Sequence, residues 1–501
     1  MIYLALLCLL SLSVTSFEIP TTIQTNLGDV LGVRHTESFT KKPIYEFRKI
    51  PYAKPPVGKL RFTRPKPYGR WLGTLDATKF GPSCYQDLEK STAFLPNTKV
   101  SEHCLFLNIY VPNNVSRSNN KSVMVWIHGG DYNKGQGMTF NGALLACIGD
   151  VIVVTINYRL GIFGFLSTGD SAASGNYGLL DQIVAIIWIR RNIKSYGGNP
   201  KSITLFGHSV GAMSISLHTL YRKNKNLFQR IILQSGFGTS PLALSTNVPH
   251  YTKQVAKLIR CSSHNTTTVV NCLRKATNKD LQSAFRDIAS KMDTPKVSPM
   301  FGPRVSGRYI SDTPSKLLRN SKSSEFYRSL DVLIGNVDSE GSAYYKLLQP
   351  YQKQFNFNLS QGIPKRILCD YVAPIVTAEL YHGHSALGEA FCNKYGRGLT
   401  LSKQTSDQID FYGDLMFYSP TVHGLAVHGS QNTSGKCFQY IFKRKTELTL
   451  TTKLPSWIKG AAHGAEIYFV SPFLELLTLS PPDGTLAQTM MKYWTNFAKH
   501  G

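Results

Sequence analysis

Acidic residues, cysteines and long apolar runs are all scarce in this 501-residue sequence. The 30 Asp and Glu are outnumbered by 56 Lys and Arg, which leaves a net charge of +26 and favours anionic partners. The basic residues are scattered, and the tightest groups lie at 41–42, 222–225 and 443–445, so no long run indicates a specific nucleic-acid site. The sequence therefore predicts either a solvated basic surface or weak association with polyanions or glycans.

The chain has nine cysteines, too few for its length to indicate a fold built from disulfides. None forms a Cys-x-x-Cys pair and no histidine pair has zinc spacing, so no metal site is expected. The sequence also lacks repeats, low-complexity segments and Gly/Ser linkers, while 42% of its residues are hydrophobic, which excludes a disordered or fibrous chain. We therefore predict one large domain.

The N-terminal stretch Met1–Ser16 is uncharged and rich in leucine, and small residues precede Phe17. It is shorter than a membrane span of about 20 residues and has the pattern of a secretory signal peptide; the alternative is a buried strand or helix. No other apolar stretch could span a bilayer, and the C-terminus lacks a lipid-anchor tail. Asn-x-Ser/Thr sequons occur at Asn114, Asn120, Asn265, Asn358 and Asn432. These features predict a secreted, extracellular glycoprotein.

Apolar runs rich in β-branched residues alternate with helical patterns along the chain. The predicted strands are Ser122–His128, Val151–Tyr158, Ser202–Phe206, Arg230–Leu233 and Asp331–Ile334. Continuous apolar strands of this kind suit a sheet that is buried on both faces. Helical spacing at Leu179–Ile193 lies between two of them. This order predicts an α/β fold with a large, mostly parallel central sheet and helices on both faces.

The motif Gly-His-Ser-Val-Gly at 207–211 follows the predicted strand Ser202–Phe206 and precedes a helical stretch, Ala212–Leu220. A tight strand-to-helix turn holds such a serine in a strained, exposed position, and small flanking residues avoid the neighbouring strand and helix. The bare motif often occurs by chance, but this context makes Ser209 a candidate nucleophile.

A second motif, His-Gly-Gly-Asp-Tyr at 128–132, comes directly after a predicted strand. Glycine pairs let backbone N–H groups approach a ligand closely, and together with the amide after a nucleophile they can form an oxyanion hole. Taken alone, the motif is equally typical of an ordinary Gly-Gly turn. Its position upstream of the serine motif favours the oxyanion hole.

A serine at its ordinary pKa is a poor nucleophile, so an acid and a histidine are expected to follow it in that order. Glu340 lies just beyond a predicted strand, where open α/β sheets place their sites, and Asp338 is the alternative. His463 lies in a loop of small residues, and His423 and His428 are the alternatives. Spacing alone leaves both choices open.

Ordered segments through nearly the whole chain resemble the type-B carboxylesterase and cholinesterase family of α/β-hydrolases. The matching segments include 51–58, 101–110, 157–161, 178–182, 233–236, 413–414 and 493–499. The resemblance implies that Ser209 is the nucleophile, Glu340 the acid and His463 the base.

The same resemblance implies the supporting parts of the site. It assigns the oxyanion hole to the amides of Gly130, Asp131 and Val210, and it makes Ser235 a supporting serine behind the site. It implies no cofactor and two disulfides, Cys84–Cys104 and Cys261–Cys272. It leaves the pairing of four cysteines undecided: Cys147, Cys369, Cys392 and Cys437.

The sequence departs from the family pattern around this site. Asp131 stands where many members have a third glycine, and His208 and Val210 flank the serine where Glu or Gln and Ala are usual. His103 replaces an aspartate near the first disulfide. We expect these changes to affect catalytic efficiency rather than the fold. The chain also stops before family members usually end, so the domain, residues 17–501, is expected to lack a final strand.

Together the motifs predict a secreted serine carboxylic ester hydrolase that acts on small-molecule esters through an acyl-enzyme. Choline-selective relatives surround the cation with a Trp, an acid and an aromatic ring, and these positions correspond here to Phe94, His208 and Ala343. Neutral esters are therefore the predicted substrates. The alternative is a binding or adhesion module that keeps the fold without turnover, and the complete set of Ser, Glu and His argues against it.

Overall fold

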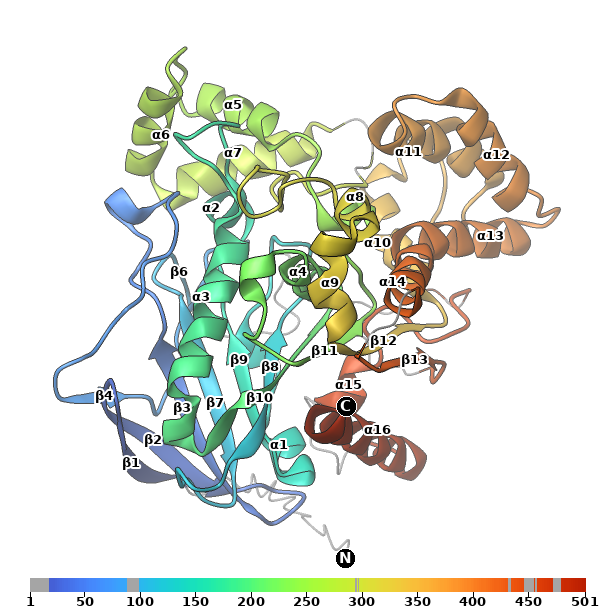
Figure 1. Ribbon diagram of the computed structural model, residues 1–501. Helices are drawn as coiled ribbons and strands as arrows, with labels where there is room; N and C mark the ends of the chain where they lie inside the picture. Colours follow the sequence, from blue (N-terminus) through green and yellow to red (C-terminus); the bar gives the residue numbers. More distant parts are fainter. Residues whose placement is uncertain are drawn as a thin grey trace, which may run out of the picture.

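The computed structural model describes residues 18–501 except 88–98, 293–294, 296, 431–433, 446–454, 456 and 472–478 (Figure 1). The strands are β1 Ile19–Thr25, β2 Gly28–Thr36, β3 Pro43–Pro51, β4 Thr74–Asp76, β5 Ser83–Cys84, β6 Val100–Ser101, β7 Phe106–Pro112, β8 Lys121–Ile127, β9 Ile152–Ile156, β10 Gly198–His208, β11 Arg230–Gln234, β12 Asp331–Val337 and β13 Cys437–Phe442. The predicted signal peptide lies outside the described residues.

The α-helices are α1 Ala143–Gly149, α2 Gly161–Phe165, α3 Tyr177–Asn192, α4 Val210–Thr219, α5 Val248–Leu258, α6 Thr266–Lys275, α7 Asn278–Ser290, α8 Pro314–Arg319, α9 Ser321–Ser329, α10 Ala343–Leu348, α11 Ala373–Leu380, α12 Ser385–Tyr395, α13 Leu401–Gly413, α14 Ser419–Gly429, α15 Ile467–Val470 and α16 Pro481–His500. Both predicted helices, and all five predicted strands, are present within a few residues of their expected bounds.

In the described part of the chain, eleven strands form one sheet, in the order β1-β2-β3-β7-β9-β8-β10-β11-β12-β13, with β4 paired to β2. From β9 to β13 in this order each strand is parallel to the next, whereas from β1 to β9 each strand is antiparallel to the next. The expected α/β fold is therefore confirmed, with an antiparallel extension built from the N-terminal part of the chain.

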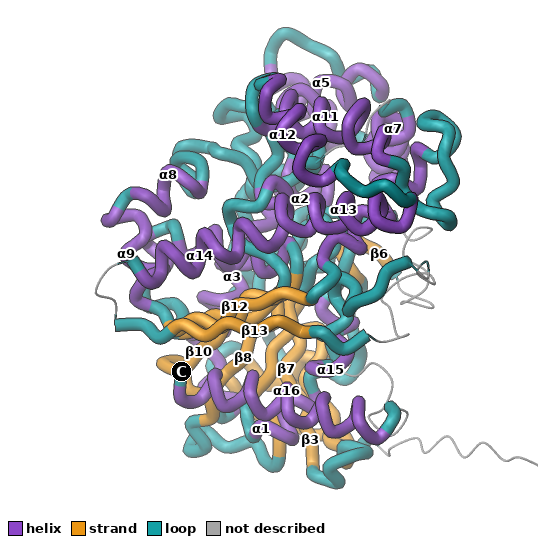
Figure 2. The backbone as a smooth tube through the Cα atoms, turned by 90° about the vertical axis from the view of Figure 1, so that its right-hand side faces the viewer, coloured by secondary structure: helices purple, strands orange, loops and turns teal. Residues whose placement is uncertain are grey.

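The sheet is buried on both faces. Alternate residues of its central strands point to opposite sides, and apolar residues on each side pack against helices. In β8, Val123 and Val125 belong to one core cluster with residues of α3 and α4, whereas Met124 and Trp126 belong to a second cluster with residues of α1 and α16. Figure 2 shows the same arrangement, with α3 and α14 above the strands and α1 and α16 below them. Helices on both faces, as predicted, leave the ends of the strands as the place for a site.

Three disulfides join Cys84 to Cys104, Cys261 to Cys272 and Cys369 to Cys392. Cys147 is free and buried, and Cys437 is free and exposed. The third disulfide connects η8, a π-helical segment at Ile367–Val372, to α12 and resolves the pairing that the sequence left open.

None of the described helices combines the length and apolar character that a bilayer span requires.

Candidate active site

Ser209 occupies the turn between β10 and α4, where its φ of 55° and ψ of −128° are strained for a side-chain-bearing residue. Its backbone N–H donates to the carbonyl of Gln234, 2.9 Å away. A side chain at Gly207 would lie 2.6 Å from the Ile127 carbonyl, and one at Gly211 would lie 2.1 Å from the same oxygen. The two glycines therefore let the turn pack directly against β8, as the motif predicts.

Glu340 and His463 are brought together from segments more than 120 residues apart. His463 Nδ1 lies 2.6 Å from Glu340 Oε2. The other carboxylate oxygen accepts hydrogen bonds from the Asn336 side chain at 3.0 Å and from the Val337 N–H at 3.1 Å. Glu340 is fully buried, and its contacts fix the carboxylate toward the imidazole. The backbone N–H of His463 also donates to Ser342 Oγ at 2.8 Å.

The alternative acid and one of the two alternative bases have other partners. Asp338 accepts a hydrogen bond from the Ala461 N–H at 2.7 Å and so supports the loop that carries His463. His428 is buried on α14 with its Nε2 2.9 Å from the Leu330 carbonyl, and His423 lies on the same helix. The geometry thus favours Glu340 and His463 over these alternatives.

No hydrogen bond among the described residues joins Ser209 to His463, although the imidazole lies beside the serine turn. The ring of His463 is 4.5 Å, centroid to centroid, from the ring of His208, the residue before Ser209. The Phe417 ring contacts the imidazole at the same distance. Catalytic hydrogen bonds often tighten only when substrate is bound, so this looser arrangement is compatible with a catalytic base.

The candidate oxyanion hole is formed by the loop after β8 and by the start of α4. The N–H groups of Gly130 and Asp131 donate to no other group in the described part of the chain, and Val210 is the first residue of α4, whose N–H has no acceptor within the helix. Asp131 adopts the left-handed conformation, with φ of 56°, and is exposed to solvent. Three donors close to the serine turn are thus available to an anion.

Ser235 follows β11 with φ of 52°, and its N–H donates to the Gly335 carbonyl at 2.8 Å. Its side chain is fully buried, and its Oγ has no hydrogen-bond partner among the residues that the structure describes. Gly236, the next residue, packs so tightly that an added Cβ would lie 2.4 Å from the Ser209 carbonyl. Ser235 therefore lies directly behind the serine turn.

A buried acid beside the site was not predicted from the sequence. Glu466, three residues after His463, is fully buried, and its Oε1 lies 4.0 Å from His208 Nε2 and 3.4 Å from Gln234 Nε2. Burial, and then the nearby charge of Glu340, raises the pKa of Glu466 to about 7. The carboxyl is thus partly protonated near neutral pH and adds less than a full negative charge next to the Glu340–His463 pair.

The family model of the carboxylesterases matches residues 19–501. The chain belongs to the carboxylesterase family. It is 33% identical to bile salt-activated lipase of Bos taurus over 491 residues, which cover 96% of this chain and 79% of the relative. It is 34% identical to bile salt-activated lipase of Rattus norvegicus over 467 residues, which cover 91% of this chain and 73% of the relative. Cholinesterase of Mus musculus is 34% identical over 477 residues, covering 91% and 75%.

Membership of the carboxylesterase family makes the protein a serine carboxylic ester hydrolase. Lipase and cholinesterase relatives are equally similar to the chain, so similarity alone does not select a substrate class.

Replacing Asp131 with glycine is expected to raise kcat on neutral esters about tenfold, which corresponds to about 1.4 kcal/mol of barrier. A carboxylate beside the developing oxyanion opposes the stabilisation that the amides provide, and glycine keeps the required positive φ without that charge. Steady-state kinetics of the two proteins on one uncharged ester measures the effect. An unchanged or lower kcat would show that the carboxylate is harmless or has a role of its own.

Proposed function

We propose that the protein is a secreted esterase that cleaves neutral small-molecule esters through an acyl-enzyme on Ser209. The observation that carries the proposal is the 2.6 Å contact between Glu340 and His463 beside a serine held in a strained strand-to-helix turn. Together they supply a nucleophile, a base and a group that orients the base.

In the proposed reaction, His463 Nε2 accepts the Ser209 proton while Ser209 Oγ attacks the ester carbonyl carbon. Glu340 accepts the Nδ1–H of the imidazole, fixes its tautomer and stabilises the imidazolium that forms. The amides of Gly130, Asp131 and Val210 hold the tetrahedral oxyanion until it collapses and the alcohol leaves with the proton from His463. A water molecule activated by His463 then releases the acid and regenerates Ser209. No step requires a cofactor.

The alternative, a binding module without turnover, is disfavoured by the presence of Ser209, Glu340 and His463 together. A module without turnover has no need for Glu340 to be buried and aimed at His463 by two further hydrogen bonds. Such an arrangement costs desolvation of a carboxylate, which a purely structural role would not require.

Secretion is supported by the uncharged leucine-rich N-terminus, by three disulfides and by the positions of the sequons. Asn114, Asn120, Asn265 and Asn358 are all exposed, and Asn432 lies outside the described residues. Asn265 caps α6 by accepting from the Thr268 N–H through its side-chain oxygen, which leaves its amide nitrogen available for a glycan.

Acetylcholine is expected to be hydrolysed with no higher kcat/KM than 3,3-dimethylbutyl acetate, its uncharged isostere. Cation–π contacts are worth about 0.5–2 kcal/mol each, and two aromatic positions and one acid are changed in this chain. Ala343 begins α10 and offers no ring, His208 lies beside Glu466, and Phe94 is outside the described residues. A clear preference for acetylcholine in paired kinetic measurements would refute the neutral-ester assignment.

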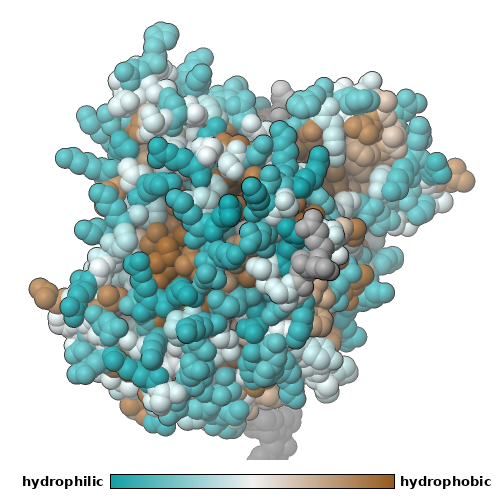
Figure 3. Space-filling view, viewed as in Figure 1, coloured by the Kyte–Doolittle hydropathy of each residue, from teal (hydrophilic) through white to brown (hydrophobic). Residues whose placement is uncertain are grey.

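We also propose weak binding of polyanionic glycans to a basic face formed by segments 222–225 and 304–329. These segments hold nine Lys and Arg against two Asp and Glu. The Tyr221 and Tyr309 rings are in contact at 4.6 Å, and Lys225 pairs with Glu325 at 2.8 Å, so the segments adjoin. Among the described residues they expose no large apolar side chain of the kind that membrane docking uses, and hydrophilic residues cover most of the face seen in Figure 3.

Removing three charges of the basic face (Lys223→Ser, Arg319→Ser and Lys322→Ser) is expected to lower the salt concentration that elutes the protein from immobilised heparin. The matched control removes three exposed lysines elsewhere, Lys66, Lys79 and Lys201, and so changes the net charge equally. Equal shifts in the two triple variants would show that only the overall charge matters and would contradict the assignment of a face.

A further inference from the structure

The oxyanion loop, residues 128–135, has an unusual backbone that it cannot hold by itself. Gly130, Asp131 and Tyr132 all have positive φ, and strained conformations of this kind persist only where surrounding contacts fix them. The loop turns back on itself through hydrogen bonds from the N–H groups of Asn133 and Lys134 to the Gly130 carbonyl, each 3.0 Å long. Support for its far end, at Gly135, comes from outside.

Gln86 provides that support through both ends of its side-chain amide. Its Oε1 accepts a hydrogen bond from the Gly135 N–H at 2.9 Å, and its Nε2 donates to the Gly135 carbonyl at 2.9 Å and to the Cys84 carbonyl at 3.1 Å. The residue is 3% exposed. Only this orientation of the amide satisfies all three contacts, because an exchange of its oxygen and nitrogen would set donor against donor.

The side-chain amide of Asn157 fixes Gly137, two residues after Gly135, in a similar way. Asn157 accepts a hydrogen bond from the Gly137 N–H at 2.8 Å, and its Nδ2 donates to the carbonyls of Pro82 and Cys104, both at 3.2 Å. Gly135 and Gly137 are thus each fixed by one buried side-chain amide.

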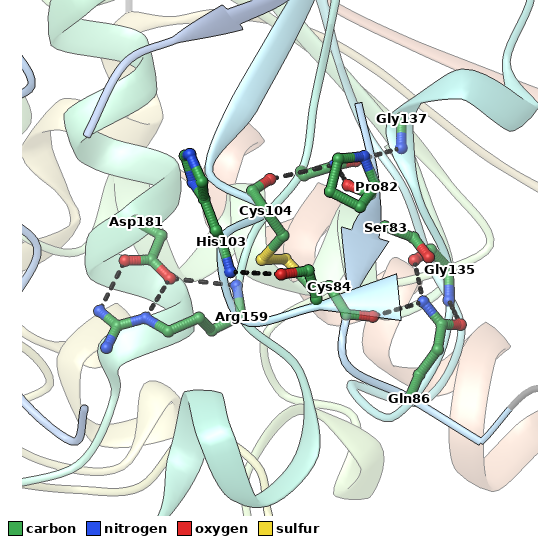
Figure 4. The surroundings of a disulfide bond; sticks show 12 residues. Pro82, Ser83, Cys84, Gln86, His103, Cys104, Gly135, Gly137, Arg159 and Asp181 are labelled. Carbon is green, nitrogen blue, oxygen red and sulfur yellow. Dashed lines mark hydrogen bonds and ion pairs between the residues drawn. A yellow bond between two sulfur atoms is a disulfide. The ribbon is translucent and has the colours of Figure 1, made fainter. Parts of the chain in front are cut away.

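Both amides are anchored on the Cys84–Cys104 disulfide. Gln86 bonds the carbonyl of one half-cystine and Asn157 that of the other. Figure 4 shows Gln86 and Gly135 on one side of the disulfide and Gly137 above it. The disulfide and the two amides therefore form a frame under the oxyanion loop.

We infer that Gln86 is a positioning residue for catalysis, which fixes the oxyanion N–H groups of Gly130 and Asp131 by tying Gly135 to the disulfide. The inference rests on the proposed function of those amides. The middle of the loop has its own anchor, since the Tyr132 carbonyl accepts from the Gly161 N–H at 2.7 Å and the Tyr132 ring contacts Phe165. Loss of Gln86 therefore loosens the loop without unfolding it.

Donors act on an oxyanion only within about 2.7–3.1 Å of its position, and loss of one donor costs about 10²–10³ in rate. A loop that keeps its N–H donors but no longer fixes their positions should cause a smaller loss of rate. Replacing Gln86 with methionine, which is close in size and makes no such hydrogen bonds, is expected to lower kcat about 10- to 100-fold. KM should stay within about twofold, because the ground-state carbonyl makes weaker contacts than the tetrahedral oxyanion.

The experiment compares the wild type with Gln86→Met after titration of active sites with an organophosphate, so that misfolded protein is not counted. Alongside kcat and KM it measures the Ki of a trifluoromethyl ketone, whose adduct with Ser209 places an oxyanion in the hole. We expect Ki to rise by the same factor by which kcat falls. The control is Asn224→Leu, which removes another buried amide, bonded to the His218 carbonyl and the Tyr309 hydroxyl. It should leave kcat and Ki per site unchanged.

Fewer titratable sites in Gln86→Met, with unchanged kcat and Ki at each site, would show that Gln86 only stabilises the fold and would overturn the inference. An unchanged variant would overturn it as well. Failure of the proposed function gives a different result, because Ser209→Ala would then retain turnover.

Discussion

Replacing Ser209 with alanine is expected to lower kcat on a neutral chromogenic ester by about 10⁶-fold, the order of loss seen when a nucleophile that acts as part of a unit is removed. The substitution deletes the oxygen that forms the acyl-enzyme, and the base then has no proton to accept. Secretion and folding should be unaffected, because Ser209 bonds its surroundings through its backbone N–H and carbonyl.

The loss is measured as turnover per folded molecule, with thermal unfolding as the check on folding. Ser216→Ala is a matched control, since this buried serine on α4 accepts a hydrogen bond from the Gly238 N–H and has no proposed part in the reaction. Its turnover should stay within about threefold of the wild type, because small changes outside the site cost little. Comparable activity in Ser209→Ala and the wild type would refute the assignment of the nucleophile.

Replacing Glu340 with glutamine is expected to lower kcat about 10⁴-fold, the size of effect produced when the acid of such a triad is replaced by its amide. An amide can present its NH₂ to His463 Nδ1, which then becomes an acceptor, and the ring proton moves to Nε2. Nε2 can no longer accept the proton of Ser209. The wrong tautomer, rather than a lost contact, is thus the cause of the inactivity.

Asp338, the alternative acid, provides the control variant for Glu340→Gln. Asp338→Asn keeps an oxygen that can accept from the Ala461 N–H, so it should reduce activity by less than about tenfold. Greater loss in Asp338→Asn than in Glu340→Gln would assign the acid to Asp338. The pH dependence of kcat/KM in both variants separates a change in the base from a change in stability.

The central part of the fold could be predicted because its strands are continuous apolar runs. The segments that became β8 to β12 are buried along almost their whole length, and this pattern differs clearly from that of a loop. The strands β1 to β7 and the last strand β13 were not predicted. Exposed residues weaken the signal of β1 to β3 and β13, whereas β7, Phe106–Pro112, was missed although all of its residues are buried.

The candidate site could be predicted only where a local motif carries the chemistry. Ser209 and the glycine loop lie in short patterns, but Glu340 and His463 were chosen over their rivals by family resemblance, since the contact between them is long-range. Glu466 and Gln86 were missed because an isolated Glu or Gln gives no sign of its burial or its partners. The Cys369–Cys392 pairing likewise depends on packing between η8 and α12, which cysteine spacing does not reveal.

Labelling the purified protein with diisopropyl fluorophosphate, and locating the adduct by peptide mass spectrometry, shows whether Ser209 is the activated nucleophile. We expect one phosphoryl group per molecule, on Ser209, with esterase activity lost in proportion to labelling. An adduct on another residue that accompanies the loss of activity, or full activity after Ser209 is labelled, would contradict this role for Ser209.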